Sequence, residues 1–155
     1  MDSKFSSLIK PTLNTKFRVD FDWWKNQDQN WKVYLQSFLC EEHKKILANF
    51  SYEDQIDLVN PQTGEVTKED ALLYTLINHC ARKPDFLSEN TALVDAIFKI
   101  FLVNQNQPLT PVELSKLINR PADLILRTIG SGKVYRGIQK IIDLVLEKEH
   151  NFPII

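Results

Sequence analysis

The residues of this chain best suited to bind a metal ion are its two cysteines and two of its three histidines. They fall in two short groups, Cys40-Glu-Glu-His43 and His79-Cys80. Thiolate sulfur and imidazole nitrogen are the usual ligands of structural zinc, which binds four of them in tetrahedral geometry. Together the two groups could bind one zinc ion that would hold two helices against each other.

The second group raises a geometric difficulty, because neighbouring residues on an α-helix point about 100° apart. His79 and Cys80 reach one ion only near a frayed helix end, which the nearby Pro84 permits. In a second interpretation Cys80 packs in the core as a free thiol and His79 is exposed. The first group is then an incidental pair at a helix start. We expect a protein without a cofactor, and zinc is the alternative.

A second pattern, at residues 113–129, joins two short helices by a tight turn. Thr110-Pro-Val-Glu113 before it is a strong helix start, with Thr as N-cap and Pro at the first helical position. The turn residue Asn119 tolerates positive φ, and Ser115 is small enough to let two helices cross steeply. The inner apolar positions are Leu114, Ile118, Ile125 and Ile129.

Over residues 110–136 this spacing resembles the helix-turn-helix of bacterial DNA-binding proteins, of the winged-helix-like superfamily. The resemblance implies that the second helix enters the major groove of DNA, where its early residues face base edges. Those early residues are Ala122, Asp123, Leu126 and Arg127. The segment Lys133-Val-Tyr-Arg136 would follow as a short wing. The residues expected to contact DNA are Lys116, Arg120, Arg127, Lys133, Tyr135 and Arg136.

The charge of the chain is unevenly distributed. The whole chain has a formal net charge of −1, which excludes a polycation that coats nucleic acid. Residues 108–140 carry six basic and two acidic residues, a net charge of +4, whereas residues 1–107 carry 12 basic and 15 acidic residues, a net charge of −3. Phosphate binding depends on such a local field rather than on the total.

A protein-interaction adaptor that uses the same three-helix unit is the alternative function. Asp123 repels phosphate, and Leu126 is apolar where a residue that reads DNA is usually polar. An apolar patch around Leu124 and Leu126 would favour the adaptor, and a basic face would favour DNA. A zinc-dependent protein is the third candidate. A Cys–His catalytic pair has no visible orienting carboxylate or oxyanion motif, and no GxSxG, HExxH, GxGxxG or Walker loop occurs, so we expect no enzyme.

The elements that must position these residues follow from the apolar spacing. Asp28 is the expected N-cap of the first helix. The helix over 91–104 is apolar nearly all round, so it is either the buried centre of the domain or the seam of a homodimer. The expected elements are an extended stretch at 19–21, helices at 28–39 and 41–49, a hairpin at 56–66, helices at 68–82 and 91–104, two helices that meet at 119–121 and end at Gly130, a short strand at 133–137, and a last amphipathic helix from Ile138.

The fold class that these elements predict is mainly α. A helical N-terminal part with one small β-hairpin, residues 1–107, packs on a C-terminal helix-turn-helix (winged-helix-like) part, residues 108–150, and the two share one core. No run of 18 apolar residues exists to span a membrane. The first residues lack the apolar region of a signal peptide, so we expect a cytoplasmic protein with reduced cysteines.

Overall fold

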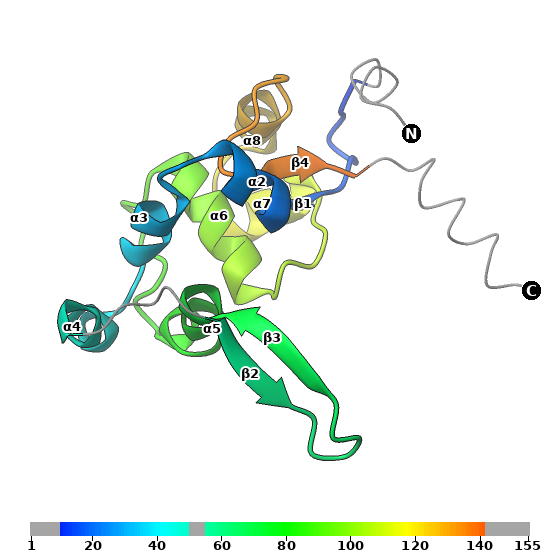
Figure 1. Cartoon of the computed structure of the whole chain (residues 1–155). Coiled ribbons are helices and arrows are strands. Elements are labelled where there is room, and N and C mark those ends of the chain that lie inside the picture. Colours follow the sequence, from blue (N-terminus) through cyan, green and yellow to red (C-terminus); the bar gives the residue numbers. More distant parts are fainter. Residues whose placement is uncertain (1–9, 50–54, 142–155) are drawn as a thin grey trace, which may run out of the picture.

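The structure is a computed structural model that describes residues 10–49 and 55–141 (Figure 1). In these residues the chain forms seven α-helices, one 3₁₀ turn and four short strands. The helices are α2 (Phe21–Gln27), α3 (Trp31–Gln36), α4 (Glu41–Asn49), α5 (Ala71–Asn78), α6 (Leu93–Val103), α7 (Pro111–Ile118) and α8 (Ala122–Ile129), with the 3₁₀ turn η1 at Cys80–Arg82. The strands are β1 (Phe17–Val19), β2 (Gln55–Val59), β3 (Val66–Asp70) and β4 (Ile138–Lys140).

Two small antiparallel sheets make this a mixed α/β fold, so the expectation of a mainly α fold with one hairpin is wrong. The expected hairpin is present as β2 and β3. The second sheet pairs β1 with β4, and Val19 lies opposite Ile138. The last helix, expected from Ile138, is therefore wrong for 138–140, and its continuation lies outside the described residues. The apolar spacing after Ile138 suits a helix. Pairing with β1 instead places the side chain of Ile138 in the core.

Helix α6 forms the centre of the core. Figure 1 shows it in the middle of the molecule, between α8 and α5. Phe98, on α6, packs edge-on against the rings of Trp24 and Tyr34, each with a centroid separation of 5.3 Å. The same hydrophobic core includes residues from both expected parts of the chain, such as Leu72 and Ile125. The apolar circumference of this helix has two interpretations, the buried centre of the domain and the seam of a homodimer. The position of α6 agrees with the first.

The helix expected over 28–39 is wrong in its boundaries. The chain forms two shorter helices there, and Asp28 ends α2 instead of starting a helix. The N-cap of α2 is Asp20, whose carboxylate accepts from the backbone N–H of Trp23 at 3.0 Å. The side chain of Asp28 instead accepts from the indole N–H of Trp24 at 3.1 Å and from the backbone N–H of Asn30 at 2.9 Å. Both hydrogen bonds fix a turn between α2 and α3.

Helix α5 is also shorter than the expected 68–82. It begins after Asp70, whose carboxylate accepts from the backbone N–H of Leu73 at 3.0 Å. It ends at Asn78, because His79 leaves the helical conformation with φ −129° and ψ −66° before η1 begins. The helix expected over 41–49 is confirmed as α4. Within the described ranges, none of the helices has the length and apolar character needed to cross a membrane.

Candidate functional site

The start of α7 has the capping arrangement that the sequence predicts. The hydroxyl of Thr110 accepts from the backbone N–H of Glu113 at 3.1 Å, and the Glu113 carboxylate accepts from the backbone N–H of Thr110 at 2.9 Å. Pro111 occupies the first helical position. These two hydrogen bonds satisfy backbone donors that a helix start leaves without partners. The beginning of α7 is therefore fixed by local sequence.

The turn between α7 and α8 is built around Asn119. This residue lies in the left-handed region, with φ 56° and ψ 48°, which asparagine tolerates better than most residues. The hydroxyl of Ser115 donates to the backbone carbonyl of Arg120 and so closes the turn. Leu114 on α7 and Ile125 on α8 are fully buried against the core. Two helices joined by a tight turn at Asn119 are thus present where the spacing predicts them.

The cations expected to contact DNA fall into two groups. Lys116 on α7, Arg127 on α8 and Lys133 after α8 are exposed. Arg120 is half-buried, and its guanidinium donates to the backbone carbonyl of Thr91 at 2.8 Å. Three of the expected cations can therefore meet a ligand, whereas Arg120 stabilises the loop before α6.

Arg136 also binds inside the molecule. Its guanidinium lies 3.2 Å from the Asp28 carboxylate and 4.0 Å above the ring centre of Tyr34. The hydroxyl of Tyr34 donates in turn to Asp95 on α6, and burial raises the pKa of this tyrosine. The backbone N–H of Asn30 holds the pKa of Asp28 below its usual value. Arg136 therefore connects the segment after α8 to the turn between α2 and α3 and to Tyr34 on α3. Tyr34 in turn provides the connection to α6.

The segment expected to be a strand at 133–137 is a turn instead. Arg136 and Gly137 both have positive φ, at 52° and 76°, and the backbone N–H of Ile138 donates to the carbonyl of Tyr135 at 2.9 Å. A Cβ on Gly137 would lie 2.7 Å from the Cβ of Trp24, so only glycine fits here. Tyr135 is half-buried, and the Lys133 ammonium lies 5.3 Å from its ring centre.

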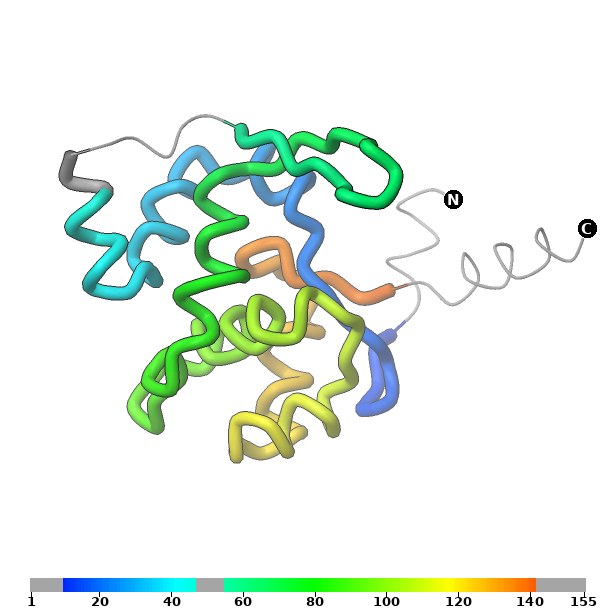
Figure 2. The backbone as a smooth tube through the Cα atoms, turned by 90° about the horizontal axis from the view of Figure 1, so that it is seen from below, coloured from blue at the N-terminus to red at the C-terminus, as the bar shows by residue number. Residues whose placement is uncertain are grey.

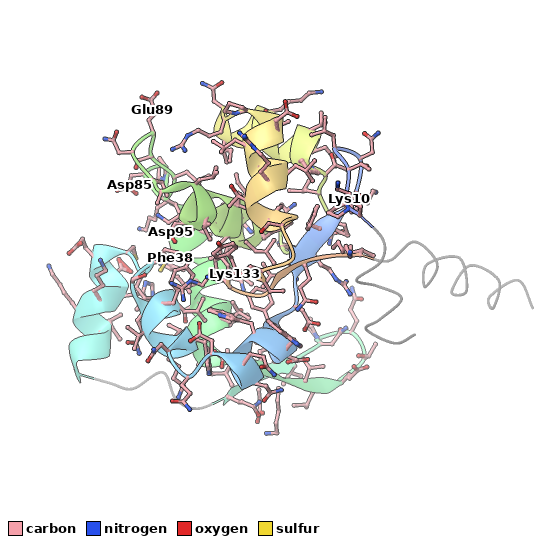
Figure 3. The ribbon with its side chains drawn as sticks, turned by 90° about the horizontal axis from the view of Figure 1, so that it is seen from above. Lys10, Phe38, Asp85, Glu89, Asp95 and Lys133 are labelled. Atoms are coloured by element: carbon pink, nitrogen blue, oxygen red, sulfur yellow. The ribbon has the colours of Figure 1, made fainter. Side chains whose placement is uncertain are left out.

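Sequence reasoning missed a contact between the N-terminal segment and the end of α8. A Cβ on Gly130 would lie 2.9 Å from the ring of Pro11, so the two residues are closely packed. Lys10, which precedes this proline, is exposed, and Figure 3 shows it beside the unit formed by α7 and α8. Lys10 thus adds an exposed cation near the end of α8. No local pattern could have indicated it, because the contact joins opposite ends of the chain.

The leucines of α8 are not among the large exposed apolar side chains of the described residues. Leu124 and Leu126 are half-buried. On α7, however, Leu117 is 55 % exposed. It borders a hollow of about 440 Å³ whose wall includes Leu87, Ala96 and Arg120. The exposed apolar surface of the unit formed by α7 and α8 therefore lies at the end of α7.

The structure brings together the four side chains of the expected metal site. Cys40 directly precedes α4, and His43 lies one turn into that helix. His79 and Cys80 occupy the junction between α5 and η1, where the helical conformation is interrupted. The break removes the divergence that two neighbours on a regular helix would have. One ligand atom from each of the four residues lies within 4.8 Å of the other three.

Three of these ligand atoms are close enough to touch. Sγ of Cys40 is 3.5 Å from Sγ of Cys80 and 3.2 Å from Nδ1 of His43, and Sγ of Cys80 is 3.7 Å from the same Nδ1. The rings of His43 and His79 are 4.2 Å apart, centre to centre. Burial raises the pKa of the Cys80 thiol to about 11 and holds the pKa of His43 below its usual value. The arrangement can hold one ion that prefers nitrogen and sulfur.

Comparisons with protein-family models, curated proteins and solved structures found no match to this chain.

Proposed function

We propose that this chain is a small DNA-binding protein, of the transcription-regulatory kind, that uses α7 and α8 as a helix-turn-helix. The observation that carries the proposal is the turn between these helices, with Asn119 in the left-handed conformation and Ser115 bonded across it. In helix-turn-helix proteins the second helix after such a turn is the recognition helix, which lies in the major groove, and α8 would take this part. The inner faces of both helices are buried, so their outer faces are available to a ligand.

The exposed charges on this unit support DNA as the ligand. Lys116, Arg127 and Lys133 come from α7, α8 and the segment after α8, and all three are exposed. Lysine and arginine at such positions bind phosphate oxygens and release counterions from the duplex. The half-buried state of Leu124 and Leu126 weighs against the adaptor, because neither is among the exposed large apolar side chains.

Two exposed residues on α8 are placed to face base edges. Asp123 and Arg127 are four residues apart, so they lie on one face of the helix. Arginine binds the O6 and N7 atoms of guanine, and a carboxylate accepts a hydrogen bond from the amino group of cytosine. The pair therefore favours sites that contain G·C base pairs. On this view Asp123 contributes to sequence preference and does not only repel phosphate.

A mobility-shift titration at rising salt tests the proposal. The double variant R127E/K133E is expected to lose binding to duplex DNA that wild-type protein shows at low salt. The matched control is K44E, because Lys44 is exposed on α4, which lies away from α8 (Figures 1 and 2). This control is expected to bind like wild type. Absence of wild-type binding at low salt, or binding unchanged in R127E/K133E, would overturn the proposal.

A protein-interaction surface is the second candidate, and the exposure of Leu117 beside the hollow at the end of α7 favours it. An exposed leucine at the rim of a cavity can bind an apolar side chain of a partner, which includes a second copy of this chain. Sedimentation velocity of wild type and L117E tests this candidate. Self-association that L117E abolishes, in a protein that does not bind DNA, would favour the interaction surface.

A further inference from the structure

The cluster formed by Cys40, His43, His79 and Cys80 takes no part in the proposed DNA binding. It belongs to α4 and to the junction of α5 with η1, whereas the proposed DNA-binding face belongs to α7 and α8. We infer that these four residues bind one zinc ion, which fastens α4 to the rest of the protein. This inference is independent of the proposed function, so either can fail alone.

The distances within the cluster match those between ligands of one tetrahedral zinc ion. Zinc lies about 2.3 Å from thiolate sulfur and about 2.0 Å from imidazole nitrogen, so ligand atoms at tetrahedral corners are about 3.8 Å apart for two sulfurs and about 3.5 Å apart for sulfur and nitrogen. The structure has 3.5 Å between the sulfurs of Cys40 and Cys80, and 3.2 and 3.7 Å from these sulfurs to Nδ1 of His43. Three corners of the tetrahedron are therefore already in place.

His79 supplies the fourth corner. Its side chain is 44 % exposed and can therefore rotate towards the ion. Nε2 of this imidazole lies 3.5 Å from the Glu42 carboxylate. An imidazole that binds zinc commonly donates its other ring N–H to a carboxylate, which fixes the ring and strengthens it as a ligand. Glu42 is placed to do this when His79 binds zinc through Nδ1.

The donor set selects the class of metal. Two thiolates and two imidazoles suit zinc, whereas magnesium and calcium require oxygen ligands. Two thiolate charges also neutralise a divalent ion, so the complex can be partly buried without a net charge. The backbone N–H of Cys40 donates to Sγ of Cys80 at 3.3 Å, so the two segments already meet at this sulfur.

The site is closed, so its role is structural. Four protein ligands complete a tetrahedron and leave no coordination position for water or substrate. Cys80 is fully buried, and the hollow of about 440 Å³ at the end of α7 is lined by residues outside the cluster. The ion would therefore hold segments together and would not take part in a reaction.

The described side chains of helix α4 bury little apolar surface. Among its described side chains, those of residues 41–46, none belongs to the hydrophobic core, and Ile46 is 37 % exposed. His43 is the half-buried one of these six, and it faces the cluster. Figures 1 and 2 show α4 at the edge of the molecule. A zinc ion bound by Cys40 and His43 would supply an attachment that apolar burial of residues 41–46 does not.

The direct test is the metal content of untagged protein, purified under reducing conditions and measured by elemental analysis. One zinc ion per chain is expected. Cobalt added to the metal-free protein is expected to give the visible absorption of tetrahedral cobalt with thiolate ligands. Both measurements use the wild-type chain, so they do not depend on whether a variant folds. Less than a stoichiometric amount of zinc together with octahedral cobalt would overturn the inference, as would a Cys40–Cys80 disulfide formed in the presence of zinc.

Variants identify the ligands. H43A, H79A and C40S are each expected to lose stoichiometric zinc, and E42Q is expected to weaken zinc binding roughly 10-fold. The matched control is H150A, which removes the third histidine of the chain, a residue outside the described ones. It is expected to retain one zinc ion. Retention of full zinc affinity in the three ligand variants, or its loss in H150A, would contradict the assignment.

Hydrogen exchange distinguishes a metal ion that stabilises α4 from an ion that binds without a structural role. Removal of zinc by a chelator is expected to abolish the protection of amides in α4, while α6 amides remain protected because that helix is buried in the core. Equal protection of α4 with and without zinc would contradict the structural role.

Discussion

At the scale of single residues, Arg136 shows that residue type does not determine use. A basic residue after a helix-turn-helix suggests phosphate binding, and the sequence predicts that role. In the structure its guanidinium pairs with Asp28 and lies on the ring of Tyr34. Its two partners are distant in the chain, so no local pattern indicates them. Phosphate binding stays a proposal for three residues whose side chains are exposed, Lys116, Arg127 and Lys133.

The Asp28 carboxylate should contribute pH-dependent stability. Its pKa is lowered in the folded state from an ordinary value of 3.8, first by the backbone N–H of Asn30 and also by Trp24 and Arg136. A group with a lowered folded pKa stabilises the protein above its unfolded pKa, and this contribution is lost as pH falls through the folded pKa. We expect D28N to reduce the free energy of unfolding by about 1 kcal/mol at pH 7, since the pair is partly exposed.

Urea denaturation of wild type and D28N from pH 7 down to pH 3 measures this contribution. The difference in the free energy of unfolding between the two proteins should be constant at neutral pH and shrink below pH 4. An equal difference in the free energy of unfolding at pH 3 and pH 7 would show that the charge of Asp28 does not contribute to stability.

At the scale of elements, α7, its turn and α8 are the part of the chain that sequence predicts best. Their signals are local: the capping pair of Thr110 and Glu113, the proline at the first helical position, and Asn119 in the turn. The elements that sequence predicts poorly depend on distant partners. Strand β4 forms because it pairs with β1, and α2 ends because the Asp28 side chain has partners outside its helix.

The left-handed turn at Asn119 gives a prediction at this scale. Glycine adopts positive φ at little cost, whereas alanine does not, so N119A should lose about 1 kcal/mol of stability and N119G should lose little or none. Thermal or urea denaturation of both variants compares them. N119G should also keep the DNA affinity of wild type, because it keeps the turn. Equal stability of N119A and N119G would mean that the backbone conformation here is not a constraint.

At the scale of the whole molecule, the sequence predicts which residues gather but not how they are brought together. The residue types and spacing of the Cys/His cluster are visible in the chain, yet its assembly depends on the end of α5 at Asn78 and the non-helical conformation of His79. The charge pattern has the same limit. The +4 charge of residues 108–140 includes Arg120 and Arg136, which bind inside the molecule, and omits Lys10, which packing places beside α8.

The salt dependence of DNA affinity tests the central claim, DNA binding by α7 and α8, most directly. The logarithm of the association constant should fall linearly with the logarithm of salt concentration, and each lost phosphate contact should reduce the slope by about 0.9. Fluorescence anisotropy on a labelled duplex should therefore give a shallower slope for K116A and for K133A than for wild type, and an unchanged slope for K44A. Failure of wild-type protein to bind at low salt, or one slope for all four proteins, would contradict DNA binding by this face.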